Sequence, residues 1–386
     1  GALAHLSRET FDARLRSREA VDRSGVWRFR ELVAPLATEH IVTRREGNTG
    51  LYDTQRVASW VGLDALQLKH EGENPTGSFK DRGMTAAISL ARSLGMQRVA
   101  CASTGNTSAS MAAYAAQAGM QAAVFVPDGK IAYGKLSQAL AYGATTLQLA
   151  GDFDDAMRLV QEVCDAEGIY LVNSINPFRI EGQKAIGFEI VQDLGWQVPD
   201  WIVLPGGNLG NNSAIAKGLI ELHQLGLIDR LPRIAVIQAA GANPLFTAWS
   251  SGQDLVPVRA DTIATAIKIG APVSWRKSLR GLAATQGVVT EVSDQQILDA
   301  KAQVDAAGIG AEPASCATVA GIKRLIAEGV IRPDEHVVGV LTGHLLKDPD
   351  VVVGYHQGTL KGYDLTYRNA PLRVDANLDA VKRALG

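Results

Sequence analysis

The sequence predicts an α/β protein with two lobes, each built on a largely parallel, twisted sheet that helices flank. Short apolar runs alternate along the chain with longer amphipathic or alanine-rich segments, which is the pattern of repeated strand–helix units. The length of 386 residues, with 46% apolar and 20% charged residues, provides for a large core and favours two lobes over one. Polar, glycine-rich motifs follow several of the apolar runs, where open α/β sheets bind their ligands.

The apolar runs predict buried parallel strands because each is short and aliphatic and is separated from the next by enough chain for a helix. Four runs belong to a first series, at residues 98–103, 122–127, 145–150 and 169–174, and three to a second, at residues 201–205, 234–239 and 337–343. Residues 24–35 predict a short helix that Ser24 caps and Pro35 ends. A helix in the second series begins at a capping box formed by Ser293 and Gln296.

This pattern predicts a division of the chain into four parts. We expect residues 1–40 to form an N-terminal segment that packs on the larger lobe, residues 41–185 an N-terminal α/β lobe, residues 186–360 a C-terminal α/β lobe and residues 361–386 a tail. No internal repeat, low-complexity tract or long linker separates these parts. We therefore expect the lobes to pack closely and the chain to cross between them.

Charge and composition exclude several classes of function. The formal net charge is −2 and no sustained run of Lys and Arg occurs, so we expect neither nucleic acid nor a membrane as a partner. The three cysteines are far apart and form no C-x-x-C pair, which predicts reduced thiols and a cytoplasmic location without a secretory signal. The seven histidines show no H-E-x-x-H spacing, so no metal site is expected.

One lysine, Lys80, is presented by the stretch KHEGENPTGSFKDRGMT at the start of a predicted helix. Gly72 and Gly77 allow a tight path, so a loop precedes the helix. The positive end of a helix disfavours an ammonium and suits a lysine that works as the neutral amine. The alternatives are a solvated surface lysine and a phosphate loop, and the second fails because Ser78 stands where the Walker lysine belongs.

A glycine-rich turn, LPGGNLGN at residues 204–211, follows the predicted strand at residues 201–205. Its glycines let backbone N–H groups approach an oxyanion, and the helix that comes next points its positive end at the same place. A phosphate fits there, although a tight turn without a ligand is the alternative. A dinucleotide site is disfavoured because the spacing G-x-G-x-x-G is absent.

Two further motifs can bind anions. The hydroxyl-rich ASTGNTSAS, residues 102–110, enters a helix whose first N–H groups suit a carboxylate, with a purely structural cap as the alternative. In NSINPFRIEGQK, residues 173–184, Arg179 offers a guanidinium fork for a second anion, with a surface salt bridge as the alternative. If the fold brings these motifs together, they would form one site that binds an amino acid and two separate anions.

Together with LTGHLLKDPD at residues 341–350, these motifs resemble, in the same order, those of the pyridoxal-phosphate enzymes of fold type II, and within them the threonine synthase family. The resemblance covers residues 24–350, and its motifs are long and specific. It implies pyridoxal 5′-phosphate as the cofactor. It also implies a homodimeric carbon–oxygen lyase acting on phosphate, which converts O-phospho-L-homoserine and water to L-threonine and phosphate.

The resemblance assigns roles to individual residues. Lys80 would bind the cofactor covalently and move the protons of the reaction. The remaining cofactor contacts would be Gly207, Asn208, Leu209, Gly210 and Asn211 at its phosphate, Asn106 at its ring oxygen and Thr342 at its ring nitrogen. The substrate carboxylate would lie against Ser103 and Thr104, and the substrate phosphate against Thr107, Asn173, Ser174 and Arg179.

Two positions near the last motif and two other functions stay open. Family members commonly have glycine where Leu345 stands, which leaves the local packing undetermined, and His344 is expected to be structural rather than a base. A serine or threonine dehydratase or a cysteate synthase would keep Lys80 and the glycine-rich turn but would have different substrate contacts. The residues around Arg179 favour threonine synthase over these enzymes. A non-catalytic ligand sensor on the same fold is disfavoured by the complete set of cofactor residues.

Overall fold

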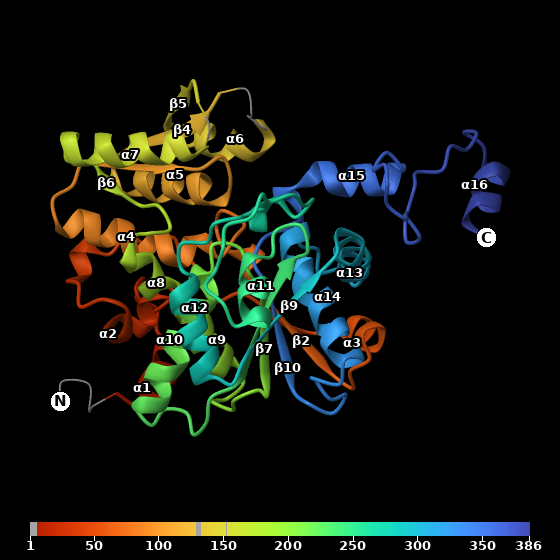
Figure 1. Cartoon of the computed structure of the whole chain (residues 1–386), viewed down its shortest axis with the longest axis horizontal. Coiled ribbons are helices and arrows are strands. Elements are labelled where there is room, and N and C mark those ends of the chain that lie inside the picture. Colours follow the sequence, from red (N-terminus) through yellow and green to blue (C-terminus); the bar gives the residue numbers. More distant parts are fainter. Residues whose placement is uncertain (1–5, 129–132, 152) are drawn as a thin grey trace.

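The chain folds into two sheets with helices around each, and the computed structural model describes residues 6–128, 133–151 and 153–386 (Figure 1). Within these residues one sheet has six strands in the order β1-β2-β10-β7-β8-β9, and the other has four in the order β5-β4-β3-β6. Neighbouring strands are parallel except β1 and β2, which are antiparallel. The predicted two-lobed α/β class is therefore confirmed.

All the strands predicted from the apolar runs are present, and β1, β2 and β9 are additional. β6 is shorter than expected, because beyond it the side chain of Asn173, rather than the backbone, pairs with Ala102. The strands are β1 (Leu51–Asp53), β2 (Leu66–His70), β3 (Arg98–Ala102), β4 (Gln121–Pro127), β5 (Thr145–Leu149), β6 (Tyr170–Leu171), β7 (Trp201–Pro205), β8 (Arg233–Ala239), β9 (Val288–Val292) and β10 (Val337–Leu341).

The helices cover both sheets, and the two predicted caps are confirmed. The Ser24 hydroxyl accepts the backbone N–H groups of Val26 and Trp27, and Ser293 and Gln296 form a capping box. The α-helices are α1 (Arg8–Leu15), α2 (Arg30–Val33), α3 (Gln55–Val61), α4 (Lys80–Ser93), α5 (Asn106–Ala118), α6 (Tyr133–Ala141), α7 (Phe153–Glu167), α8 (Pro177–Gln183), α9 (Ala185–Asp193), α10 (Gly210–Gln224), α11 (Pro244–Ser251), α12 (Trp275–Ala284), α13 (Asp294–Ala306), α14 (Pro313–Ala327), α15 (Pro349–Gln357) and α16 (Leu378–Leu385). Short 3-10 turns are η1 (Trp27–Phe29), η2 (Thr38–His40), η3 (Glu71–Glu73), η4 (Thr265–Ile267) and η5 (Leu345–Lys347).

The chain crosses between the lobes. β1 and β2, which the expected division assigns to the lobe of residues 41–185, belong to the six-stranded sheet, where Leu68 of β2 lies opposite Gly339 of β10. Leu66 and Leu68 are buried in the same apolar cluster as Val337 and Leu341. The shared burial explains why β2 and β10 pair. Because the two strands are far apart in the sequence, the periodicity of either one alone does not indicate this pairing. The chain enters the large sheet, builds the small one, and then returns.

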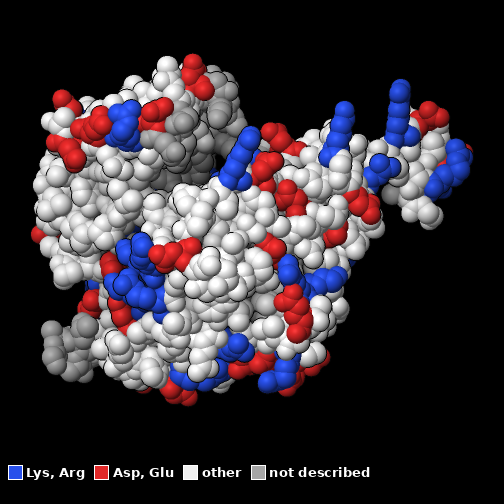
Figure 2. Space-filling model, viewed as in Figure 1, with Lys and Arg blue, Asp and Glu red and all other residues white. Residues whose placement is uncertain are grey.

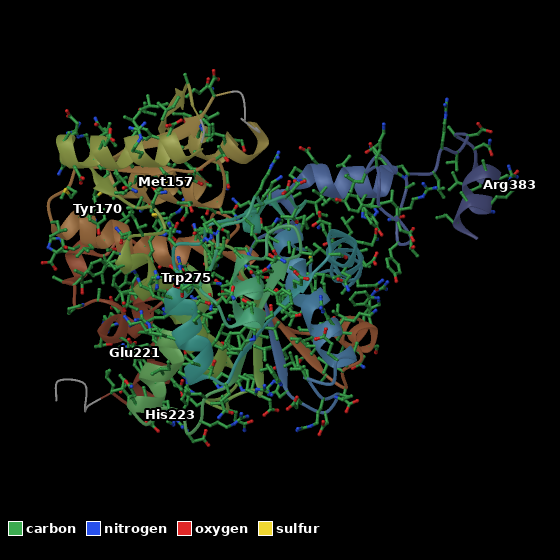
Figure 3. The ribbon with its side chains drawn as sticks, viewed as in Figure 1. Met157, Tyr170, Glu221, His223, Trp275 and Arg383 are labelled. Carbon is green, nitrogen blue, oxygen red and sulfur yellow. The ribbon has the colours of Figure 1, made fainter. Side chains whose placement is uncertain are left out.

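The two ends of the chain behave differently. Near the N-terminus Phe11 and Phe29 are fully buried in the core of the larger lobe, and the ring centroids of Phe29 and Phe188 lie 5.2 Å apart. The C-terminal tail instead extends away from both lobes, with Arg383 of α16 at its far end (Figures 1 and 3). In the described part of the chain, no helix has the length and apolar character required to cross a membrane.

A cluster of buried charges fixes the start of α4. Arg82 donates to Glu71 and Glu189, with N–O distances of 2.6 and 2.9 Å, and the Lys69 ammonium lies 2.7 Å from Glu189 Oε1. All four side chains are fully excluded from solvent. Removing one partner would leave an uncompensated buried charge, so the cluster resists any shift of α4 relative to the large sheet. Because Lys80 is the first residue of α4, its position is fixed as well.

Candidate active site

A cavity of about 910 Å³ lies between the lobes, and Figure 2 shows a hollow at their junction. This volume is in the range of sites that enclose a cofactor and a small substrate. Residues from both sheets contribute, because the motifs that follow β3, β6, β7 and β10 meet there. Every predicted site residue lines the cavity: Lys80, Ser103, Thr104, Asn106, Thr107, Asn173, Ser174, Arg179, Gly207, Asn208, Leu209, Gly210, Asn211 and Thr342.

Lys80 begins α4, as predicted, and the loop before it is tightly held. Gly77 has a φ of +84°, and its carbonyl oxygen accepts the backbone N–H of His344 at 2.9 Å. The carboxylate of Asp81 accepts the Thr76 backbone N–H at 2.7 Å and the Thr76 hydroxyl at 2.6 Å. These bonds hold the chain on both sides of Lys80, which lines the cavity.

Burial, together with the nearby positive charge of Arg179, lowers the pKa of Lys80 to about 7 against the opposing effect of Glu312. An ordinary lysine has a pKa of 10.5. A substantial share of Lys80 is therefore the neutral amine near neutral pH, which is the form that acts as a nucleophile or a base.

The glycine-rich turn joins β7 to α10 and is shaped by close contacts. A Cβ on Gly206 would lie 2.5 Å from Val236 Cγ1, and Leu209 adopts a left-handed φ of +64°. α10 then begins at Gly210 with its free N–H groups at the cavity. The amide oxygen and nitrogen of Asn211 are buried without hydrogen-bond partners. A turn with unpaired donors at a helix N-terminus is suited to a phosphate.

The hydroxyl-rich motif enters α5, which begins at Asn106. The Ser103 hydroxyl accepts the Gly105 N–H at 3.2 Å, and Thr104 and Thr107 line the cavity beside it. The amide nitrogen of Asn106 lies 3.3 Å from Oε2 of Glu312. The first turn of α5 therefore presents hydroxyl and N–H groups to the cavity, as a carboxylate site requires.

Arg179 is buried in the cavity wall with unused donors. Nη1 donates to Val172 O at 3.1 Å, and Nε has no partner. Burial lowers the pKa of Arg179 to about 10, so the guanidinium remains charged at neutral pH. A buried charge with unsatisfied N–H groups is suited to an incoming anion.

The neighbours of Arg179 are more occupied than expected. The amide of Asn173 already exchanges two hydrogen bonds with the backbone of Ala102, at 2.9 and 3.1 Å. The Ser174 hydroxyl accepts the amide N–H of Asn208 at 2.9 Å, which joins this loop to the glycine-rich turn. Asn173 therefore connects the ends of β3 and β6, and Ser174 connects its own loop to the glycine-rich turn.

Thr342 lies at the end of β10, where Ser315 of α14 holds it. The Ser315 hydroxyl accepts the N–H of Thr342 at 2.9 Å and lies 3.0 Å from its Oγ1. Leu345, which stands where the resembling family has glycine, packs against Gly310: a Cβ there would lie 2.4 Å from Leu345 Cδ2. His344 accepts the N–H of Leu346 through Nδ1. The Leu345 side chain is thus accommodated against Gly310, and Leu345 is not among the described residues that line the cavity.

Three residues that sequence reasoning missed complete the site: Asp81, Glu312 and Ser315. Asp81 and Ser315 act through the loops they hold, whereas Glu312 faces the cavity directly. Glu312 precedes Pro313 at the start of α14, so the sequence indicates only a helix cap there. Their roles depend on contacts between α4, α5, α14 and β10, which no local pattern reveals.

The residues present fit pyridoxal 5′-phosphate. Its phosphate matches the glycine-rich turn with the unpaired Asn211 amide, and its aldehyde requires an unprotonated lysine amine, which Lys80 supplies in part near pH 7. Thr342 and Asn106 offer polar groups in the same cavity for the ring. The fit leaves Arg179 free for a second anion.

Comparisons with known proteins agree with this geometry. The family model "Pyridoxal-phosphate dependent enzyme" matches residues 42–343. The chain is 49% identical to a threonine synthase of Methanosarcina acetivorans over 365 residues, 93% of this chain and 86% of that protein. It is 44% identical to a threonine synthase of Methanocaldococcus jannaschii over 377 residues, 97% of this chain and 89% of that protein.

Solved structures show the same fold at low identity. A fungal L-serine ammonia-lyase from Rhizomucor miehei has a TM-score of 0.68 at 20% identity, and the match covers 79% of this chain and 97% of that one. A threonine deaminase isoform from Solanum lycopersicum has a TM-score of 0.67 at 20% identity, over 78% of this chain and 86% of that one. Fold and site together define a pyridoxal-phosphate dependent enzyme of fold type II. Within this class the chain belongs to the threonine synthase family.

Proposed function

We propose that the chain converts O-phospho-L-homoserine and water to L-threonine and phosphate. The observation that carries this proposal is the buried guanidinium of Arg179, whose Nε has no partner and which lines the same cavity as Lys80 from α8, a different element from the glycine-rich turn. One anion site serves the phosphate of the cofactor and the other serves the phosphate of the substrate. The two threonine synthase relatives support the same reaction.

The cofactor would be held at three points. The backbone of residues 207–211 and the Asn211 amide would bind its phosphate, Asn106 its ring oxygen and Thr342 its ring nitrogen. When bound, pyridoxal 5′-phosphate supplies an electron sink that stabilises negative charge on the carbon atoms of the substrate. A threonine hydroxyl holds the ring nitrogen without a full charge, because it is a weaker partner than a carboxylate.

Lys80 would carry the proton transfers. A substantial share of its amine is neutral near pH 7, so it can remove the proton from Cα of the substrate and later return one. The same amine would serve Cβ, from which a proton leaves before the γ-phosphate departs. Water then adds at Cβ, and the products are threonine and inorganic phosphate.

Substrate selection would rest on the small lobe. Ser103, Thr104 and the first turn of α5 would bind the carboxylate, and Thr107, Ser174 and Arg179 would bind the phosphate. Because the Asn173 amide is occupied by Ala102, Asn173 would hold the strand ends that frame this site. A bidentate contact from Arg179 is the strongest of these interactions.

An assay of product formation tests the proposal. The purified protein, loaded with pyridoxal 5′-phosphate, is incubated with phosphohomoserine, phosphoserine, serine or threonine, and threonine, phosphate and 2-oxo acids are measured. Equal amounts of threonine and phosphate from phosphohomoserine alone are expected. Rapid 2-oxo acid formation from serine or threonine would instead identify a dehydratase, the main alternative.

We also propose that the protein is a cytoplasmic homodimer. The three cysteines are all unpaired, which agrees with a reducing compartment. One chain has a mass of 41.0 kDa, so light scattering of the purified protein would distinguish a monomer from a dimer. Cell fractionation would test the location. A monomer in solution, or enzyme found outside the cytoplasm, would contradict the respective proposal.

A further inference from the structure

Glu312 is the only acidic side chain among the described residues that line the cavity, which also contains the cations Lys80, Arg179, Lys268 and Lys347. A cavity that binds two phosphate groups is expected to be positive, and a carboxylate in its wall repels both. An acid at this place therefore needs a specific role that outweighs the repulsion.

The structure fits Glu312 closely into the wall. Its backbone N–H donates to Gly343 O at 3.0 Å, and its side chain, which is only 4% exposed, lies over Gly343. A Cβ on Gly343 would lie 2.4 Å from Oε1 of Glu312. Gly343 follows Thr342, so the carboxylate lies beside the residue assigned to the ring nitrogen of the cofactor.

The carboxylate of Glu312 faces the amide of Asn106 across the cavity wall. Asn106 Nδ2 lies 3.4 Å from Oε1 and 3.3 Å from Oε2. The other charged groups that act on Glu312 are Lys347, Lys80 and Asp348, and burial raises the pKa of its carboxyl above the usual value. An ionised carboxylate only accepts hydrogen bonds, so it fixes which end of the Asn106 amide faces it.

We propose that Glu312 is a positioning residue that holds the nitrogen end of the Asn106 amide toward the ring oxygen of the cofactor. One N–H of Nδ2 then points to Glu312, and the second remains for the ring oxygen. Without a carboxylate the amide could turn over and present its oxygen, which would repel the cofactor oxygen. The inference rests on the assignment of Asn106 to that oxygen under the proposed function.

The test measures cofactor affinity rather than turnover. Glu312→Gln keeps the shape of the side chain but can present either a donor or an acceptor to Asn106. We expect its dissociation constant for pyridoxal 5′-phosphate, measured by titrating the apoprotein, to rise about tenfold, the value of one lost charge-assisted hydrogen bond. The affinity for 3-deoxypyridoxal 5′-phosphate, which lacks the ring oxygen, should not fall with the same substitution.

Two controls separate positioning from charge and from folding. Asp348→Asn removes a negative charge that acts on Glu312 and keeps an oxygen that can accept the Thr265 hydroxyl, and it should leave the affinity for pyridoxal 5′-phosphate within about twofold of wild type. In a double-mutant cycle, the effects of Glu312→Gln and Asn106→Ala on cofactor affinity should not add, because Glu312 acts through Asn106. The melting temperature of each apoprotein verifies that the fold persists.

Three outcomes would overturn the inference: equal loss of affinity for both cofactors, additive effects in the cycle, or an unchanged affinity in Glu312→Gln. None of these depends on which substrate the wild type uses. If the wild-type protein binds the cofactor but forms no threonine, the proposed function fails while the Glu312 experiment still gives an answer.

Discussion

The carbonyl oxygen of Arg82 fills the space beside Gly182, so closely that a Cβ on Gly182 would lie 1.9 Å from it. Arg82 belongs to α4 and Gly182 to α8, and the two helices approach each other at this point. α4 carries Lys80 and α8 carries Arg179. The missing side chain of Gly182 therefore allows the close approach of the two helices that carry the Lys80 amine and the Arg179 guanidinium.

Replacing Gly182 by alanine should push the two helices apart. The backbone carbonyl cannot move aside as a flexible side chain would, so we expect the free energy of unfolding to fall by about 1–3 kcal/mol. Urea unfolding of the apoprotein measures the loss. Gly187→Ala in α9 is the matched control, because its Cβ would meet the side chain of Leu219 at 3.3 Å, and little change is expected. Equal losses in both variants would contradict the role given to the close approach.

The low pKa of Lys80 predicts the pH dependence of its labelling. In the apoprotein its amine should react with an acylating reagent at a rate that rises through pH of about 7, because protonation blocks the lone pair below that pH. Exposed lysines should react only near their ordinary pKa of 10.5. Peptide mapping identifies the labelled residue, and Lys80→Ala should lose this label and all turnover while it unfolds cooperatively.

The variant Arg179→Ala tests what lowers the pKa of Lys80. It removes a positive neighbour, so the pH midpoint of Lys80 labelling should move upward. A midpoint that stays fixed would mean that burial alone sets the Lys80 pKa.

Sequence patterns predicted the strand–helix order and the cavity residues well, because each motif follows a strand that local composition already indicates. Lys80 begins its helix, and the glycine-rich turn joins β7 to α10 as expected. β1 and β2 were missed because a short strand that pairs with a distant one has no distinct local signal. Glu312 was missed for a similar reason: only its contact with Asn106, more than two hundred positions away, distinguishes it from an ordinary helix cap.

The buried charge cluster behind α4 predicts a large effect on stability. Burial opposes ionisation of Glu189, but the cations Arg82, Lys69 and Arg28 hold its pKa well below the usual value. Glu189→Gln leaves these cations without their shared partner, so we expect a loss of about 3–5 kcal/mol in the free energy of unfolding at pH 7. Glu328→Gln, in an exposed pair with Arg324, should change it by less than about 1 kcal/mol.

The same cluster predicts how stability depends on pH. Because the pKa of Glu189 is lower in the folded than in the unfolded protein, its contribution is fully present above the unfolded value of 4.5 and is lost as the pH falls through the folded value. Denaturant titrations between pH 7 and pH 3 should therefore show a steeper decline for wild type than for Glu189→Gln. Parallel declines would show that other carboxylates control acid unfolding.

Arg179 should decide between substrates. If its guanidinium binds the substrate phosphate, Arg179→Ala should lower kcat/KM for phosphohomoserine by about thirty- to a thousandfold, which corresponds to about 2–4 kcal/mol of lost charge-assisted contact. Arg179→Lys should recover only part of the loss, because a point charge cannot reproduce a planar fork. Cofactor affinity should persist, because the glycine-rich turn is a separate site.

Serine, which has no phosphate, is the contrast substrate for the same variant. Any slow deamination of serine should be nearly indifferent to Arg179→Ala, since the guanidinium has nothing to bind in that substrate. Steady-state kinetics with both substrates on one protein preparation gives the ratio of the two kcat/KM values. Differences in folding or cofactor content cancel in this ratio. Equal losses for phosphohomoserine and serine would show that Arg179, buried against Val172, supports the fold or the cofactor rather than the substrate phosphate.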